Sequence, residues 1–152
     1  MRRFAALVAA ACVAVAASLC ISVAFAASPG VYEGWLYKSN GQRWRATFTT
    51  LTVRDTAAGQ RFRLSVYNMR LGCPYLDENG NQAHARFRFV HRGVVDGNRI
   101  DDTREYPRDD PTQIVRVRGT FSGRRFTGRI TVRSAPGVAG ACTGSARVRV
   151  NR

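Results

Sequence analysis

Apolar and polar residues alternate with a period of two along most of the chain between Val31 and Val150. Successive side chains of a β-strand point to opposite faces, so this period is typical of strands that are buried on one face and solvated on the other. We predict seven strands and a shorter eighth. The seven cover residues 31–38, 43–54, 60–70, 84–95, 112–120, 124–133 and 144–150, and the shorter one covers residues 99–103.

Short segments rich in Gly, Asn and Asp separate these strands. Asn79-Gly80 and Asp96-Gly97 suit the positive φ angles of tight hairpin turns. Connections this short leave no room for helical crossovers, so the strands should be antiparallel. The chain is therefore expected to be all-β, either an antiparallel sandwich or a small barrel of seven to eight strands, and the pattern does not choose between them.

The alternation also assigns a face to each side chain. Trp35, Tyr37 and Tyr75 are interpreted as core residues, with the rim of a ligand site as the alternative. The residues expected to face the core are Phe62, Leu64, Val66, Phe87, Phe89, Val115, Val117, Phe126, Ile130, Val132, Val148 and Val150.

Residues 1–26 have the pattern of a helical signal peptide. Arg2 and Arg3 precede an uncharged apolar run, which ends in the small residues Ala24 and Ala26 before a Ser-Pro-Gly sequence. We expect cleavage after Ala26 and a single β-rich domain of residues 27–152. An uncleaved anchor is the alternative, because the apolar run is long enough to span a bilayer. Its richness in alanine and the lack of a following basic cluster favour cleavage, so the mature protein should be secreted or extracytoplasmic, without a transmembrane span.

The number and positions of the cysteines are consistent with export. Cys12 and Cys20 would leave with the leader, and the mature chain keeps Cys73 and Cys142. Two cysteines in an exported protein predict one disulfide bond. They lack the paired spacing of a zinc site, and an oxidising compartment does not suit a catalytic thiol. Cys73 is expected in the loop after the third strand and Cys142 just before the last strand.

The chain is strongly basic, with a formal net charge of +14 over 152 residues. Loss of Arg2 and Arg3 would leave about +12. Such a surface attracts anionic polymers or an anionic component of the cell envelope, although a flat sheet offers no groove for sequence-specific reading of nucleic acid. A merely solvated charged face is the alternative interpretation. The candidate anion-binding residues are Arg61, Arg63, Arg86, Arg88, Arg116, Arg118, Arg125, Arg129, Arg147 and Arg149.

Catalytic and metal-binding motifs do not emerge from the sequence. His84 and His91 are seven residues apart on a predicted strand, so they should point to opposite faces, with His91 at the edge of the core. Residues 77–81 begin like a calcium loop, but Gln82 and Arg88 stand where such a loop needs Gly and Glu. We interpret the segment as a hairpin turn, and we predict no metal ion and no cofactor.

Six of the ten acidic residues lie between positions 96 and 110. We interpret this stretch as a solvated loop in which Arg99, Arg104 and Arg108 neutralise much of the negative charge; a cation site or a pair of hydrolytic carboxylates is the alternative. The six acidic residues are Asp96, Asp101, Asp102, Glu105, Asp109 and Asp110.

Two C-terminal motifs accompany the predicted last strands: a G-x-F…F-x-G hairpin over residues 119–128 and a C-x-x-G-like run at residues 141–144. With these motifs and one disulfide, the chain resembles small secreted β-rich proteins of high-GC bacteria. The resemblance implies fold and export and carries no activity.

These observations favour an exported, non-catalytic β-domain that binds an anionic partner at the cell envelope. A small barrel that carries an apolar ligand is the first alternative, although the early G-x-W signature of such barrels is absent. A secreted hydrolase that uses carboxylates of residues 96–110 is the second.

Overall fold

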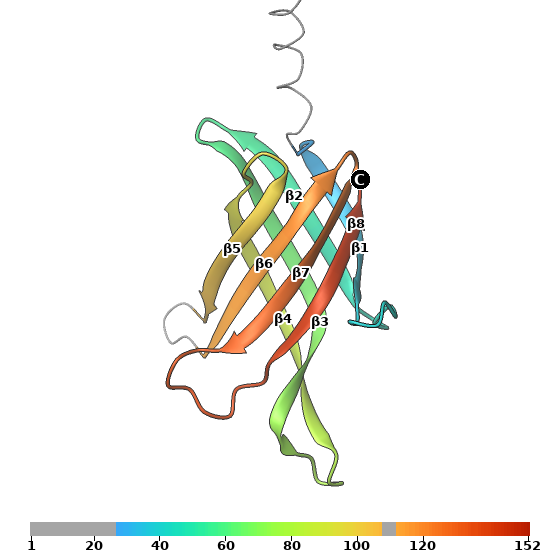
Figure 1. Cartoon of the computed structure of the whole chain (residues 1–152), viewed down its shortest axis with the longest axis vertical. Helices are drawn as coiled ribbons and strands as arrows, with labels where there is room; N and C mark the ends of the chain where they lie inside the picture. The colour runs from blue at the N-terminus through green and yellow to red at the C-terminus, as the bar shows by residue number, and fades with distance from the viewer. Residues whose placement is uncertain (1–26, 108–111) are drawn as a thin grey trace, which may run out of the picture.

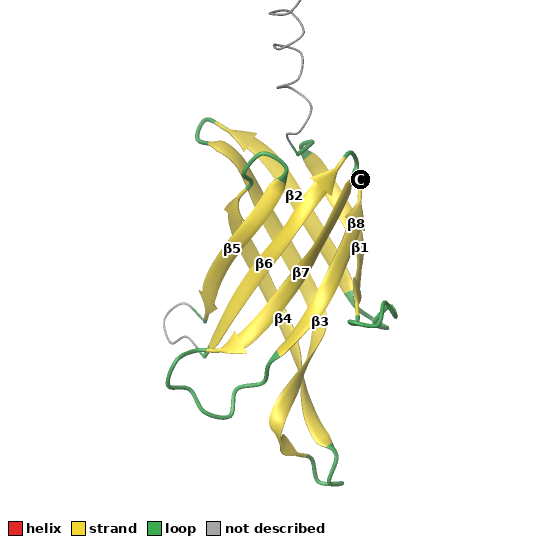
Figure 2. Cartoon of the chain, in the orientation of Figure 1, coloured by secondary structure: helices red, strands yellow, loops and turns green. Residues whose placement is uncertain are grey.

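The computed structural model describes residues 27–107 and 112–152, which form eight strands (Figures 1 and 2). The predicted signal peptide, residues 1–26, lies outside the described residues, as do Arg108, Asp109 and Asp110. The strands are β1 (Gly30–Tyr37), β2 (Phe48–Thr56), β3 (Gly59–Leu76), β4 (Gln82–Val94), β5 (Arg99–Tyr106), β6 (Gln113–Ser122), β7 (Arg125–Ser134) and β8 (Gly144–Asn151).

The eight strands of the described chain belong to one sheet, in the order β4-β3-β2-β1-β8-β7-β6-β5, and each neighbouring pair is antiparallel. The sheet curls so that β5 to β8 cross in front of β2 to β4 (Figure 1). The all-β antiparallel prediction is confirmed. Of the two architectures left open, the structure has the nearly closed, barrel-like one, because a single continuous sheet replaces the two sheets of a sandwich.

The interior is filled by the apolar residues that the alternation assigns to the core. Tyr32, Leu36 and Phe126 are its bulkiest fully enclosed side chains together with leucines of β2 and β3. Of the residues expected to face inward, eleven are buried, and Phe87 packs against them in a partly buried position. Burial of apolar area contributes roughly 25 cal/mol per Å², so this cluster is the main source of stability.

The G-x-F…F-x-G hairpin has a packing explanation. Gly119 of β6 pairs directly with Gly128 of β7, and both lie against the ring of Phe126. A Cβ added at Gly119 would lie 2.5 Å from that ring, so the two glycines leave the space that Phe126 fills. Phe121 packs on the same ring, with 4.9 Å between centroids.

Three strands differ from their predicted bounds by three residues or more at one end. β2 begins at Phe48 and not at residue 43, because the chain turns after β1: the amide of Lys38 donates to the carbonyl of Gln42, and Ala46 has a φ of 57°. β3 continues to Leu76 because β4 pairs with it, with two irregularities, from Arg61 as far as Leu76. β5 is a full strand to Tyr106, so Asp101, Asp102 and Glu105 lie on a strand and not in the solvated loop we expected.

Cys73 and Cys142 lie at disulfide distance, with 2.03 Å between their Sγ atoms. Cys142 precedes β8 as predicted, but Cys73 lies within the extended β3 and not in a loop after it. Next to the disulfide, Gly72 and Thr143 form an isolated bridge with hydrogen bonds in both directions. The cross-link therefore fixes the segment before β8 to the part of β3 that extends toward the protruding hairpin (Figure 1).

The aromatic residues interpreted as core do not enter it. Trp35 is 37% exposed and Tyr75 is 56% exposed, while Tyr37 is partly buried. On β1 the inward positions are held by Tyr32 and Leu36, so the same alternation directs Trp35 and Tyr37 outward. The interpretation was wrong because it weighed the apolar character of these rings above their place in the alternation.

Candidate functional site

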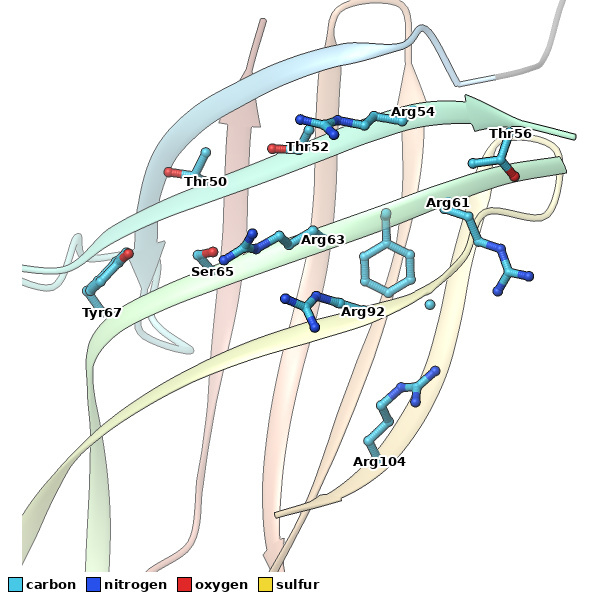
Figure 3. Close-up of a pocket in the computed structure, with 12 residues that line it drawn as sticks. Thr50, Thr52, Arg54, Thr56, Arg61, Arg63, Ser65, Tyr67, Arg92 and Arg104 are labelled. Atoms are coloured by element: carbon cyan, nitrogen blue, oxygen red, sulfur yellow. The ribbon is translucent and has the colours of Figure 1, made fainter. Parts of the chain in front are cut away.

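A hollow of about 670 Å³ lies on the outer face of β2, β3 and β4 and reaches β5 (Figure 3). Five arginines and five hydroxyl-bearing side chains line it, together with Phe62 and Gly93. The arginines are Arg54, Arg61, Arg63, Arg92 and Arg104, and the hydroxyl groups come from Thr50, Thr52, Thr56, Ser65 and Tyr67. We call this site the arginine hollow.

The register of the sheet places arginines opposite one another. Arg54 of β2 pairs with Arg61 of β3, and Arg63 of β3 pairs with Arg92 of β4. Like charges directly opposite each other on the same face destabilise a sheet. The fold therefore holds four guanidinium groups on one face although the repulsion between them destabilises the sheet locally.

In the described chain, carboxylates do not neutralise these four arginines. Within the part of the chain that the structure describes, no ion pair joins Arg54, Arg61, Arg63 or Arg92 to a carboxylate. Arg104 has one, because its Nε lies 3.2 Å from Oδ2 of Asp102. The arginine hollow thus presents a concentration of positive charge with donors that suit phosphate, sulfate or carboxylate oxygens.

The hollow opens where the sheet fails to close. β4 and β5 are the two ends of the strand order, and no ladder of hydrogen bonds pairs them among the residues described. We call the line between them the seam. Phe62, Gly93 and Arg104 belong to the inward-facing sets of their strands and still line the hollow, because the hollow extends to the seam.

A buried histidine bridges the seam. Nε2 of His91 on β4 donates to Oδ2 of Asp102 on β5 at 2.7 Å, and the hydroxyl of Tyr106 donates to the carbonyl of Val90 at 2.9 Å. The same hydroxyl lies 3.2 Å from Nδ1 of His91. The ring of Phe62 stacks on His91 at 5.9 Å. These side-chain contacts thus hold β4 and β5 together, whereas backbone hydrogen bonds hold the other neighbouring strands together.

Burial lowers the pKa of the His91 imidazole, and the hydrogen bond to Asp102 opposes this effect only in part. The neutral ring is therefore favoured, and it donates one proton to the carboxylate. Asp102 in turn accepts a hydrogen bond from Nε of Arg104. Because of this chain of contacts, His91 positions Asp102, and Asp102 positions Arg104 at the edge of the arginine hollow.

Gly93 makes this arrangement possible. A Cβ at Gly93 would lie 2.7 Å from the ring of Phe62 and 2.8 Å from the carboxyl group of Asp102. Only a residue without a side chain lets Asp102 cross the seam to His91.

The ten arginines proposed from the sequence all project from outer faces, but the structure divides them among separate places. Arg61 and Arg63 enter the arginine hollow. Arg86 lines a small hollow with Arg45 and Arg70, and Arg88 stacks over Tyr67.

The other six arginines lie on β6, β7 and β8. Arg116 and Arg118 both lie within ion-pair distance of Asp101, at 2.9 and 3.4 Å, and the Arg116 hydrogen bond lowers the pKa of that carboxyl. Arg125 donates to Asn151. Arg129, Arg147 and Arg149, together with Arg118, line a hollow of about 460 Å³ over β5 to β8.

Three arginines of the arginine hollow were missed. Arg54 and Arg92 occupy outward-facing positions of their predicted strands, so the alternation was sufficient to add them to the candidate anion-binding residues. Arg104 could not have been found in this way, because it lies on the inward side of β5 and reaches the hollow only through the seam.

Other candidate chemistry is dispersed. Asp101 and Asp102 are adjacent on β5, so their carboxyl groups point to opposite faces. Asp77 closes the turn between β3 and β4 by accepting the amides of Asn79 and Asn81, both at 2.9 Å, as the hairpin interpretation expects. In residues 27–107 and 112–152, no three His, Cys, Asp or Glu side chains gather into a group that could hold a metal ion.

The same described ranges contain no helix with the length and apolar character needed to cross a membrane. Comparison of the chain with protein-family models, curated proteins and solved structures gives no match.

Proposed function

We propose that this protein is an exported, non-catalytic domain that binds an extended anionic partner of the cell envelope through the arginine hollow. The observation that carries the proposal is the pairing of Arg54 with Arg61 and of Arg63 with Arg92 without carboxylate partners in the described chain. Residues that break a local stability rule are typical of binding sites, because a ligand supplies the missing partner.

The chemistry of the hollow suits repeated oxyanions. Guanidinium groups bind phosphate, sulfate and carboxylate oxygens in a bidentate way, and neighbouring hydroxyl groups add neutral donors. Adjacent arginines on one strand, such as Arg61 and Arg63, are about 7 Å apart along the strand, and neighbouring strands are about 4.8 Å apart. Several charges of one polymer can therefore be bound at once.

The Cys73–Cys142 disulfide supports export, because such bonds persist in oxidising compartments. The predicted leader of residues 1–26 supports it as well. Neither of the other functions considered gains support: apolar side chains pack the interior, and the adjacent carboxylates of Asp101 and Asp102 point to opposite faces of β5.

The test compares two double variants of equal charge. Arg63→Ser with Arg92→Ser removes two guanidinium groups from the hollow. Arg116→Ser with Arg118→Ser removes two that Asp101 already pairs with. Polyphosphate binding, measured by titration calorimetry at several salt concentrations, should weaken roughly tenfold or more in the first variant, and its salt slope should fall by roughly 1.5.

The second variant is the control for net charge and should bind within about threefold of the wild type. Equal losses in both variants would show that net charge alone drives binding and would refute the site. Coincident thermal unfolding curves establish that both variants fold, which we expect because the replaced side chains face solvent.

A further inference from the structure

A row of aromatic rings crosses the outer face of three neighbouring strands. Phe48 of β2 pairs directly with Tyr67 of β3, and the ring of Trp35 on β1 meets the ring of Phe48 edge to face, with 5.9 Å between centroids. Phe48 is 39% exposed, much like Trp35. These three aromatic residues form a line on the outer face of the sheet, so a large apolar surface lies outside the core.

Arginines cover parts of this row. The guanidinium carbon of Arg88 lies 4.6 Å from the centre of the Tyr67 ring, and that of Arg43 lies 4.6 Å from the centre of the Trp35 ring. Arg149 lies over Tyr37 at 5.1 Å. These contacts orient the rings and surround them with positive charge.

Beside Trp35 lies a further hollow of about 530 Å³, on the outer face of β1, β7 and β8. It differs from the arginine hollow because it combines aromatic rings with both hydrogen-bond donors and a carboxylate. Its lining residues include Glu33, Trp35, Tyr37, Arg125, Arg149 and Asn151. We call it the mixed hollow.

Glu33 distinguishes between kinds of polyanion. Its carboxylate accepts hydrogen bonds and carries a negative charge, so it repels a chain of phosphates, which offers no protons in return. A sugar ring has hydroxyl groups that donate to such an acceptor and C–H groups that pack against aromatic rings. The side chains of Arg125 and Asn151, joined by a hydrogen bond of 3.2 Å, add donors and acceptors within the same hollow.

The two hollows lie at the two ends of the aromatic row. Tyr67 lines the arginine hollow and Trp35 lines the mixed hollow. The two residues are separated by two interstrand steps, roughly 10 Å. One polymer chain can therefore place acidic groups in the arginine hollow and a sugar ring in the mixed hollow.

We infer that the anionic partner is an acidic polysaccharide, a chain of uronate sugars, and that the mixed hollow binds one of its rings through Trp35, Tyr37 and Glu33. This inference rests on the proposed binding of anions in the arginine hollow. It adds a sugar-binding subsite, which decides between a polyuronate and a phosphate polymer.

The experiment uses polygalacturonate, polyphosphate of similar charge and neutral dextran as probes, in titration calorimetry. Trp35→Ala should weaken polygalacturonate binding at least tenfold and leave polyphosphate binding within twofold. Tyr75→Ala is the matched aromatic control, since Tyr75 is exposed on the β3–β4 hairpin and lines neither hollow. It should leave both affinities unchanged, and dextran should bind none of the variants.

Glu33→Val should weaken the binding of polygalacturonate without weakening that of polyphosphate. It removes a negative charge, so polyphosphate binding should stay the same or tighten, whereas polygalacturonate binding should weaken about fivefold or more through loss of the hydroxyl acceptor. The residue is exposed, so folding should not be affected. Tighter binding of both polymers would overturn the inference.

Fluorescence gives an independent measurement. The chain has two tryptophans, Trp35 and Trp44, so a Trp44→Phe variant reports on Trp35 alone. Polygalacturonate should shift its emission and polyphosphate should not. Binding of polyphosphate without polygalacturonate, or equal loss of both in Trp35→Ala, refutes the sugar subsite and leaves the proposed function standing. Failure of both polymers to bind the wild type refutes the proposed function itself.

Discussion

Nε2 of His91 lies 2.7 Å from Oδ2 of Asp102, and this contact joins β4 to β5, the two edge strands of the sheet. A hydrogen bond to a charged group contributes roughly 1.5–3 kcal/mol, and it costs more when a buried partner is left alone. The closure of the barrel-like sheet therefore depends on a few side chains. The same contacts position Arg104 beside the arginine hollow, so the closure of the sheet and the position of this arginine are coupled.

The lowered pKa of His91 predicts that the protein becomes less stable in mild acid. The unfolded chain takes up a proton on this ring as the pH falls below about 6.5, whereas the folded protein, in which the ring is buried beside Asp102, Arg104 and Tyr106, resists protonation to lower pH. The free energy of unfolding should thus be at its full value above pH 6.5 and fall by on the order of 1 kcal/mol per pH unit below it. Urea unfolding between pH 7.5 and pH 5 measures this.

His91→Gln should be less stable at pH 7.5 and should lose this part of the pH dependence. His84→Gln is the control, because His84 is exposed on the same strand, and it should keep the dependence of the wild type. A wild-type stability that is flat from pH 7.5 to pH 5 would contradict the assignment.

Gly93→Ala should destabilise the protein by roughly 1–3 kcal/mol, because the added methyl group would overlap Phe62 and the carboxyl group of Asp102. It should also weaken polyphosphate binding, since a displaced Asp102 no longer holds Arg104. Thermal unfolding and calorimetry measure the two effects. Gly72→Ala is the control: its Cβ would meet the end of the flexible Gln82 side chain at 3.2 Å, so little change is expected.

The Cys73–Cys142 disulfide closes a loop with a sequence separation of 69 residues. On the loop-entropy estimate, its removal lowers the free energy of unfolding by about 4 kcal/mol. The double Cys→Ala variant should show this loss in urea. Alkylation of the denatured wild type should label neither cysteine before reduction and both after it; labelling without reductant would rule out the bond.

The hydroxyl of Thr49 is buried and has no hydrogen-bond partner within the described ranges. Thr49→Val should therefore stabilise the protein by about 1 kcal/mol, since it removes an unsatisfied polar group and keeps the shape of the side chain. Thr47→Val provides the opposite case, because Oγ1 of Thr47 donates to the carbonyl of Trp44 at 3.1 Å. That variant should be destabilised, and equal effects of the two changes would be the contradictory result.

The sequence by itself determined the strands and their faces, because the period of two is a local property of each strand. Phe62 and Leu64 were assigned to the core and Arg61 and Arg63 to the surface from neighbouring residues alone, and the structure confirms all four assignments. The alternation also places Trp35 on the outer face of β1, whereas its apolar character alone led us to assign it to the core.

Only the tertiary structure decided which residues of different strands become neighbours. Arg63 and Arg92 are 29 positions apart in the chain, and their pairing depends on the register between β3 and β4, which includes a bulge. The approach of His91 to Asp102 depends on how far the sheet curls, and curl is the sum of small twists over eight strands. Such long-range geometry has no counterpart in a local pattern. For that reason the sequence did not reveal that Asp102, within the acidic stretch, lies at the seam beside His91.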